Sequence, residues 1–154
     1  MARAVTASIA DEVTIGDLAG LVGYHLRRAS AVVGNDFSRT LDGTGIRQVL
    51  FGIMSIVKAN PGINQGAAGR ALGIKRANMV SLINELTDRD LVDRKVAPED
   101  RRAFSLALSA AGEAMFEQCV SRIRAHEDRL LSDLSADERT ALIDLLSRIE
   151  AQDR

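Results

Sequence analysis

The stretch that most constrains the fold runs from Asn64 to Leu108. A short segment rich in small residues, 64–72, ends at Gly73, and a second helical run follows from Lys75 to about Asp90. The apolar residues of this run recur at helical spacing and are expected to face a core: Met79, Val80, Ile83, Leu86 and Leu91. A helix, a tight turn and a second helix form the helix-turn-helix pattern, which any helical hairpin can also show.

The residues after this helical pair distinguish a helix-turn-helix domain from an ordinary helical hairpin. Residues 91–96 and 103–108 are both predicted to be short strands, and the charged, proline-containing loop 97–102 joins them. A helix-turn-helix followed by a hairpin with a basic tip is a winged helix. We therefore predict a mainly α fold with a small β-hairpin wing, and assign residues 45–108 to a winged helix-turn-helix domain.

Further helices are predicted on both sides of this domain. The first covers residues 15–40, with Thr14 and Asp17 as its capping pair, and the second covers 46–59. Beyond the wing, Ser109 is expected to cap a helix that runs to about Ser132. Ser135 and Glu138 then form a capping box for a last helix. Because these helices are amphipathic, we expect 1–44 and 109–154 to be dimerisation helices.

The charge is unevenly distributed. The net charge is −1, but residues 1–74 carry +2, residues 75–102 carry +1 and residues 103–154 carry −4. Local basic clusters, rather than the total charge, decide phosphate binding, so this composition permits DNA binding. The chain has no apolar run near the roughly 20 residues of a membrane span and no signal-peptide pattern at its start, so we expect a cytoplasmic protein without membrane contact.

No pattern of an enzyme or a metal site is present in the sequence. There is no G-x-S-x-G elbow, no phosphate-cradling glycine loop and no CxxC pair. The two histidines, His25 and His126, are far apart in the sequence and lack the spacing of zinc ligands. We expect no catalytic residues, no cofactor and no metal.

A family resemblance can now be stated. Residues 72–112, LGIKRANMVSLINELTDRDLVDRKVAPEDRRAFSLALSAAG, resemble the signature of the MarR transcription regulators, and Pro61–Gln65 resembles the start of that family's helix-turn-helix. The matching positions are Leu86, Leu91, Val92, Arg94, Pro98, Asp100, Arg102, Leu108, Ser109 and Gly112. The chain departs from the family at Asp90, where glycine is frequent, and at Arg47, Leu50 and Ala68-Gly69.

The resemblance implies a transcriptional repressor that binds double-stranded DNA sites as a homodimer. The helix from Lys75 would enter the major groove, with Lys75, Arg76, Asn78, Ser81 and Asn84 contacting bases or phosphates. Asn64 and Gln65 would contact phosphates from the preceding helix. Simple solvation of Asn78 and Ser81 is the alternative interpretation.

In the wing, the resemblance implies that Arg102 enters the minor groove while Asp100 holds its guanidinium. Arg94, Lys95 and Arg101 would contact phosphates or remain solvated charges. The alternative for Asp100 and Arg102 is an ion pair that only stabilises the hairpin.

The resemblance also implies a small effector, of the aromatic acid or acyl-coenzyme A class. Candidate ligand residues are Tyr24, His25, Arg27 and Arg28 on the first helix, together with the apolar residues Phe51, Met54, Met115 and Phe116. At helical spacing, the apolar residues also fit an ordinary core. Ligand binding would shift the dimer towards a spacing that no longer fits adjacent grooves.

Two alternative functions stay open at this stage. A redox-responsive regulator would use Cys119, the single cysteine, although its apolar sequence context favours an inert buried thiol. A winged-helix protein-interaction module would have lost specific DNA binding altogether. Steep weakening of DNA binding with salt would distinguish a regulator from such a module.

Overall fold

The computed structural model describes residues 13–96 and 104–153. The chain divides between Asp36 and Phe37 into two units. The first unit contains the 3-10 helix η2 (Gly16–Gly20) and most of helix α1 (Val22–Thr40).

The predicted first helix is wrong at its start. Residues 16–20 form a 3-10 helix rather than α-helix, and Leu21 then adopts an extended conformation before α1 begins. The hydroxyl of Thr14 accepts a hydrogen bond from the backbone N–H of Gly16 (3.2 Å), so it does not cap a helix together with Asp17. Gly16 has a positive φ of 57°, which an α-helix does not accommodate. The apolar periodicity of the sequence therefore continues through a point at which the α-helical conformation is interrupted, and it predicted one helix where the structure has two segments.

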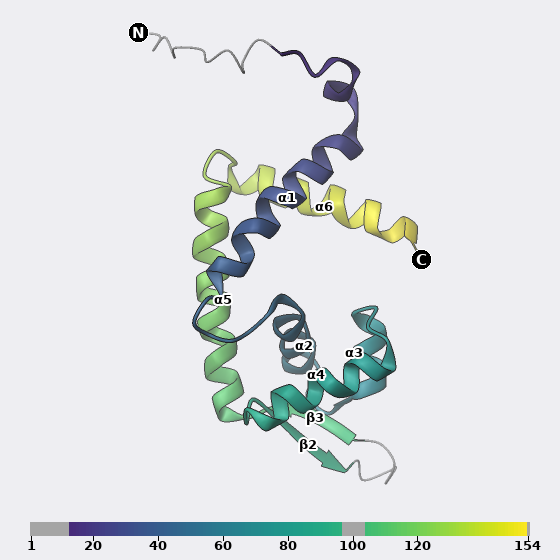
Figure 1. Cartoon of the computed structure of the whole chain (residues 1–154), viewed down its shortest axis with the longest axis vertical. Coiled ribbons are helices and arrows are strands. Elements are labelled where there is room, and N and C mark those ends of the chain that lie inside the picture. The colour runs from purple at the N-terminus through teal and green to yellow at the C-terminus, as the bar shows by residue number, and fades with distance from the viewer. Residues whose placement is uncertain (1–12, 97–103, 154) are drawn as a thin grey trace. The chain divides into compact units, whose positions relative to one another are not determined.

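The second unit contains the predicted winged helix and the helices that follow it (Figure 1). Its elements in chain order are α2 (Gln48–Ala59), β1 (Ile63–Asn64), α3 (Gln65–Ala71), α4 (Arg76–Asp88), β2 (Val92–Val96), β3 (Phe104–Leu108), α5 (Ala110–Leu130), α6 (Ala136–Glu150) and η3 (Ala151–Asp153).

The sheet is antiparallel with strand order β1-β3-β2. Arg94 of β2 and Ile63 of β1 both lie opposite Leu106 of β3. Leu106 is fully buried, so the central strand anchors the sheet to the helices. The two-residue strand β1 was not predicted, because it exists only through its pairing with distant residues.

The core lies where α2 packs against α5 and the sheet. Its fully buried members include Leu50, Ile53, Met54 and Val57 of α2. From α4, Met79, Ile83 and Leu86 are buried as predicted. Val80 was predicted to face the core with them, and this is wrong, since its side chain is 41% exposed. Burial therefore assigns one face of α4 to the core and the face that carries Val80 to solvent.

Hydrogen bonds and close packing link the start of α5 to the residues that follow α4. The hydroxyl of Ser109 accepts a hydrogen bond from the N–H of Gly112 (2.9 Å) and donates one to the carbonyl of Asp90. A Cβ at position 112 would lie 1.9 Å from the carbonyl oxygen of Leu91, so only glycine fits. The predicted Ser109 cap is confirmed.

Residues 131–135 join the end of α5 to the start of α6, and α5 spans 21 residues, about 31 Å along its axis. The hairpin and α6 are therefore joined to opposite ends of α5 (Figure 1). The predicted capping box of Ser135 and Glu138 is confirmed at the start of α6. Apolar side chains of α6 are exposed: Leu142, Ile143, Leu145 and Ile149. None of the helices in the described part of the chain combines the length and apolar character needed to cross a membrane.

Candidate DNA interface

Helix α4 presents a polar face to solvent. Its predicted contact residues are all exposed: Lys75, which is the N-cap residue, Arg76, Asn78, Ser81 and Asn84. The buried face of Met79, Ile83 and Leu86 fixes the rotation of the helix about its axis. The polar face is therefore the one that α4 offers to a partner.

The two predicted residues of the preceding helix lie next to this face. Asn64 is the N-cap residue of α3, and its Oδ1 accepts a hydrogen bond from the N–H of Ala67 (2.8 Å). Gln65, the first residue of α3, is half-buried. The side-chain oxygen of Asn64 is thus used in capping, and its side-chain NH₂ group is the part that can donate a hydrogen bond to a phosphate.

A groove of about 530 Å³ brings together side chains from α3, the start of α4 and the base of the wing. The described residues that line it include three arginines, one aromatic ring and no carboxylate. They are Asn64, Gln65, Gly66, Gly69, Arg70, Ile74, Arg76, Met79, Val80, Arg94 and Phe104. A concave surface with arginines and no acidic side chain attracts anions.

Arg94 joins the wing to α4. Its Nη2 donates a hydrogen bond to Oδ1 of Asn84 (2.8 Å), and its guanidinium lies 5.2 Å from the ring centre of Phe104. Its Nε is buried and has no hydrogen-bond partner among the described residues. Arg94 and Asn84 were both predicted to contact DNA, and the structure shows that they also bind each other.

The rest of the predicted wing is only partly described. Lys95 is exposed on β2, opposite Ser105 of β3. Asp100, Arg101 and Arg102 lie outside the described residues. Their predicted roles in the minor groove stay predictions.

Two groove residues were missed in the sequence. Arg70 is exposed in the last turn of α3, and Phe104 is exposed at the start of β3. Helical spacing from Gln65 did not indicate Arg70, because residues five apart lie about 140° apart around a helix axis. Phe104 gave no signal either, because its position depends on the pairing of β3 with β2.

Four predicted ligand residues gather on α1, within the first unit. Arg28 donates a hydrogen bond from Nη1 to the hydroxyl of Tyr24 (3.3 Å), and the guanidinium carbons of Arg27 and Arg28 lie 5.6 and 5.7 Å from the centre of its ring. His25 contacts the same ring edge-on, with 5.4 Å between ring centres. These residues therefore form one cationic and aromatic cluster on α1.

The four predicted apolar ligand residues belong to the second unit and lie in or against the core. Phe51 of α2 and Phe116 of α5 stack with 5.2 Å between ring centres and 4° between ring planes. Met54 is fully buried, and Met115 is partly buried against the same cluster. Packing between α2 and α5 thus accounts for these side chains without a ligand.

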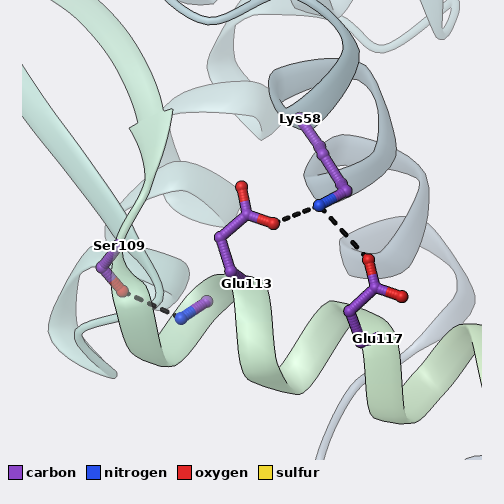
Figure 2. A network of polar contacts seen from close by, with 5 residues as sticks. Lys58, Ser109, Glu113 and Glu117 are labelled. Atoms are coloured by element: carbon purple, nitrogen blue, oxygen red, sulfur yellow. Dashed lines mark hydrogen bonds and ion pairs between the residues drawn. The ribbon is translucent and has the colours of Figure 1, made fainter.

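A polar network borders this aromatic stack. Figure 2 shows Lys58 of α2 between the carboxylates of Glu113 and Glu117 of α5, with Nζ 3.3 Å from Oε1 of Glu117. The hydrogen bond with Glu113 raises the pKa of Lys58 above its ordinary value, although desolvation acts in the opposite direction. Lys58 also lies 5.4 Å from the ring centre of Phe116. The network links α2 to α5, and Lys58 would be charged at neutral pH even without it.

Cys119 is fully buried in α5. Burial raises the pKa of its thiol above the ordinary value, and this effect outweighs a hydrogen bond with Thr44 and the charges of Arg122 and Arg89. A peroxide sensor needs an exposed thiol with a lowered pKa, so both properties oppose such a role. Across residues 13–96 and 104–153, no three His, Cys, Asp or Glu side chains cluster as metal ligands would.

Comparison with known proteins gives consistent matches. The sequence model described as the MarR family matches residues 49–103. A transcriptional regulatory protein for the hcr operon of Thauera aromatica is 32% identical over 143 residues, which cover 92% of this chain and 86% of that protein.

Solved structures of the repressor CouR are also similar. CouR bound to a 23-mer DNA duplex is 35% identical, with a TM-score of 0.83 over 90% of this chain and 99% of CouR. CouR bound to p-coumaroyl-CoA is 33% identical, with a TM-score of 0.74 over 90% of this chain and 98% of CouR.

Proposed function

The chain belongs to the MarR family, whose members are transcriptional regulators and not enzymes, and on this premise we propose that it represses transcription from a pseudo-palindromic DNA site. It would bind as a homodimer, and a small anionic ligand would release it. Residues 45–108 would contact DNA, and residues 1–44 and 109–154 would supply the dimer interface.

One observation carries the proposal of DNA binding. The exposed polar face of α4 borders a groove that contains Arg70, Arg76 and Arg94 and no carboxylate among its described residues. A helix of this kind fits the major groove, and arginines beside it fit the flanking phosphates. The similar CouR has been solved on a DNA duplex, which supports DNA binding by this chain.

The proposed contacts follow from the chemistry of each side chain. Lys75 and Arg76 would bind phosphates or guanine edges, and Asn78 and Ser81 would bind base edges. In the wing, Arg102 would enter the minor groove with Asp100 holding its guanidinium.

Exposed apolar residues support the homodimer. Ile15, Leu18, Leu21 and Val22 in the first unit are exposed, as are four apolar residues of α6. Apolar side chains that are exposed together on one segment can form a patch of the kind that marks a protein–protein contact surface. A dimer would present its two α4 helices about one DNA turn apart, roughly 34 Å.

We propose an aromatic acyl-coenzyme A thioester as the effector class. The p-coumaroyl-CoA complex of CouR supports this class. The cluster of Tyr24, His25, Arg27 and Arg28 supplies cations and an aromatic ring for a nucleotide or phosphate group. Phe51, Met54, Met115 and Phe116 of the second unit contribute to the core, so they would have to repack before they could bind an effector.

The test is fluorescence anisotropy with duplexes from the DNA that flanks the gene. We expect tight binding that weakens steeply between 50 and 200 mM salt, roughly 10³-fold or more for six or more phosphate contacts. Arg102→Ala should lower the affinity while the dimer stays intact in sedimentation. Addition of p-coumaroyl-CoA should release the DNA.

The outcomes separate the parts of the proposal. Salt-insensitive or absent binding on a broad set of fragments would favour a protein-interaction module. Binding that no thioester or aromatic acid disturbs would keep the repressor and remove this effector class. A monomer in sedimentation would contradict the dimer.

A further inference from the structure

The segment that joins α1 to α2, residues 41–47, has a defined conformation. The hydroxyl of Thr44 donates to the carbonyl of Leu41 (2.6 Å) and accepts from the N–H of Ile46 (3.0 Å), and Thr44 is only 7% exposed. Gly43 and Gly45 have φ values of 80° and 68°, in the left-handed region that favours glycine. The segment is therefore a fixed loop.

Arg89, the C-cap residue of α4, forms two hydrogen bonds with this loop. Its Nη1 donates to the carbonyl of Gly45 (2.8 Å) and its Nη2 to the carbonyl of Thr44 (2.9 Å). A Cβ at position 45 would lie 3.1 Å from Nη2 of Arg89, so glycine there also leaves room for the guanidinium. Two successive carbonyls on one planar fork make a contact that is specific in direction as well as distance.

Two other contacts involve the same loop. Arg47 pairs with Glu85, one turn before Arg89 on α4, but both side chains are exposed (60% and 37%), so the pair contributes little. Arg122 of α5 donates to the carbonyl of Asp42 (2.8 Å). The loop is thus fastened to α5 by Arg122 and to α4 mainly by Arg89.

We propose that Arg89 is a positioning residue for DNA recognition. By holding the C-terminal end of α4 to the loop that follows α1, it makes the orientation of α4 depend on the position of that loop. This inference rests on the proposed function, in which α4 enters the major groove. When the end of α1 moves the loop, α4 must follow it or both hydrogen bonds of Arg89 break, because such bonds tolerate only small changes in length and angle.

The first experiment measures amide hydrogen exchange in the free full-length protein. Arg89→Ala should accelerate exchange about tenfold both in residues 41–47 and at the end of α4, where Asp90 and Leu91 donate backbone hydrogen bonds. Arg89→Lys can keep one of the two bonds and should lie between wild type and Arg89→Ala. Arg122→Ala is the matched control on the same loop, and should accelerate exchange in residues 41–47 only.

The second experiment measures DNA affinity against salt. Arg89→Ala should bind about tenfold more weakly with an unchanged salt dependence, and Arg89→Lys should recover part of the loss. A direct phosphate contact would instead lower the salt slope by about one. Val57→Ala, a core truncation, controls for stability and should not change the DNA affinity well below the melting temperature of the variant.

The outcomes are distinct. Accelerated exchange at both sites, with weaker binding and an unchanged slope, supports the proposal. A reduced slope overturns it, because Arg89 would then contact phosphate, and so does unchanged exchange at the end of α4. If the wild type binds no DNA, the proposed function has failed, whereas the exchange data still decide whether Arg89 couples the loop to α4.

Discussion

Nη2 of Arg94, in the middle of β2, lies 2.8 Å from Oδ1 of Asn84 on α4 and donates a hydrogen bond to it. The same guanidinium packs on the ring of Phe104 across the hairpin. One side chain therefore links the wing to the helix beside it, and Arg94 and Asn84 were both predicted from the sequence to contact DNA.

The first prediction concerns this pair. Arg94→Ala and Asn84→Ala should each weaken DNA binding, but the double variant should lose less than the sum, with a coupling free energy of about 1 kcal/mol. Anisotropy titrations of the four proteins at one salt concentration measure it. The pair Asn84 and Lys95, which no hydrogen bond or ion pair joins among the described residues, is the control and should be additive. Additivity for Arg94 and Asn84 would mean that they contact DNA separately.

The second prediction concerns the cap of α5. Ser109→Ala removes a hydrogen bond to the N–H of Gly112 and another to the carbonyl of Asp90. We expect a loss of about 1–2 kcal/mol in the free energy of unfolding, measured in urea. Ser121→Ala, at an exposed position inside the same helix, should change it by less than about 0.5 kcal/mol. Equal effects of the two substitutions would count against the cap.

The third prediction concerns Gly112. An alanine methyl group would lie 1.9 Å from the carbonyl oxygen of Leu91, and a backbone atom cannot move aside cheaply. Gly112→Ala should cost about 3 kcal/mol or more, or prevent folding. Gly23→Ala in α1 is the control, because nothing lies within 4 Å of its added Cβ, and it should be neutral or stabilising. A stable Gly112→Ala protein would contradict the observed packing of α5 on Leu91.

The fourth prediction concerns pH and Cys119. Burial raises the pKa of this thiol in the folded state, so the unfolded chain loses the proton first as pH rises. Stability is then fully present below the ordinary thiol pKa and falls above it, by at most about 1.4 kcal/mol per pH unit. Urea unfolding between about pH 7 and 10 should show this slope in wild type, and Cys119→Ala should flatten it.

Lys58 does not interfere in that range. Its pKa is raised, chiefly by the hydrogen bond with Glu113, so its contribution is fully present below the ordinary lysine pKa and is lost only above it. The same slope in wild type and Cys119→Ala would mean that the thiol is accessible in the folded protein.

Local sequence signals predicted the helix caps of α5 and α6, although they failed at the start of the first helix. Ser109, Ser135 and Glu138 cap their helices as expected, because capping depends on residues three positions apart. Asp90 has a φ of 56°, in the left-handed region, at the position where glycine is frequent in the family. Aspartate tolerates this conformation better than most residues, so the departure changes no element.

Features that depend on distant residues could not be predicted. Val80 fits the helical spacing of a core residue, but its exposure depends on where the sheet and α3 lie. The hydrogen bonds from Arg89 to two backbone carbonyls, 44 and 45 positions away in the sequence, have no local sequence signature. For the same reason the groove arginine Arg70 was missed, whereas Arg76 and Arg94 were recognised from the motif.

The separation of the hairpin and α6 by the length of α5 has a consequence for kinetics. Residues 103–154 carry a net charge of −4, while the described part of the groove near the hairpin contains arginines and no carboxylate. The electric field of a polyanion such as DNA exerts a torque on a protein whose charge is distributed in this way. The torque turns α6 away from the DNA and α4 towards it before contact. Productive encounters should therefore be more frequent than for a protein that approaches in random orientations, and this advantage should disappear as the Debye length shortens.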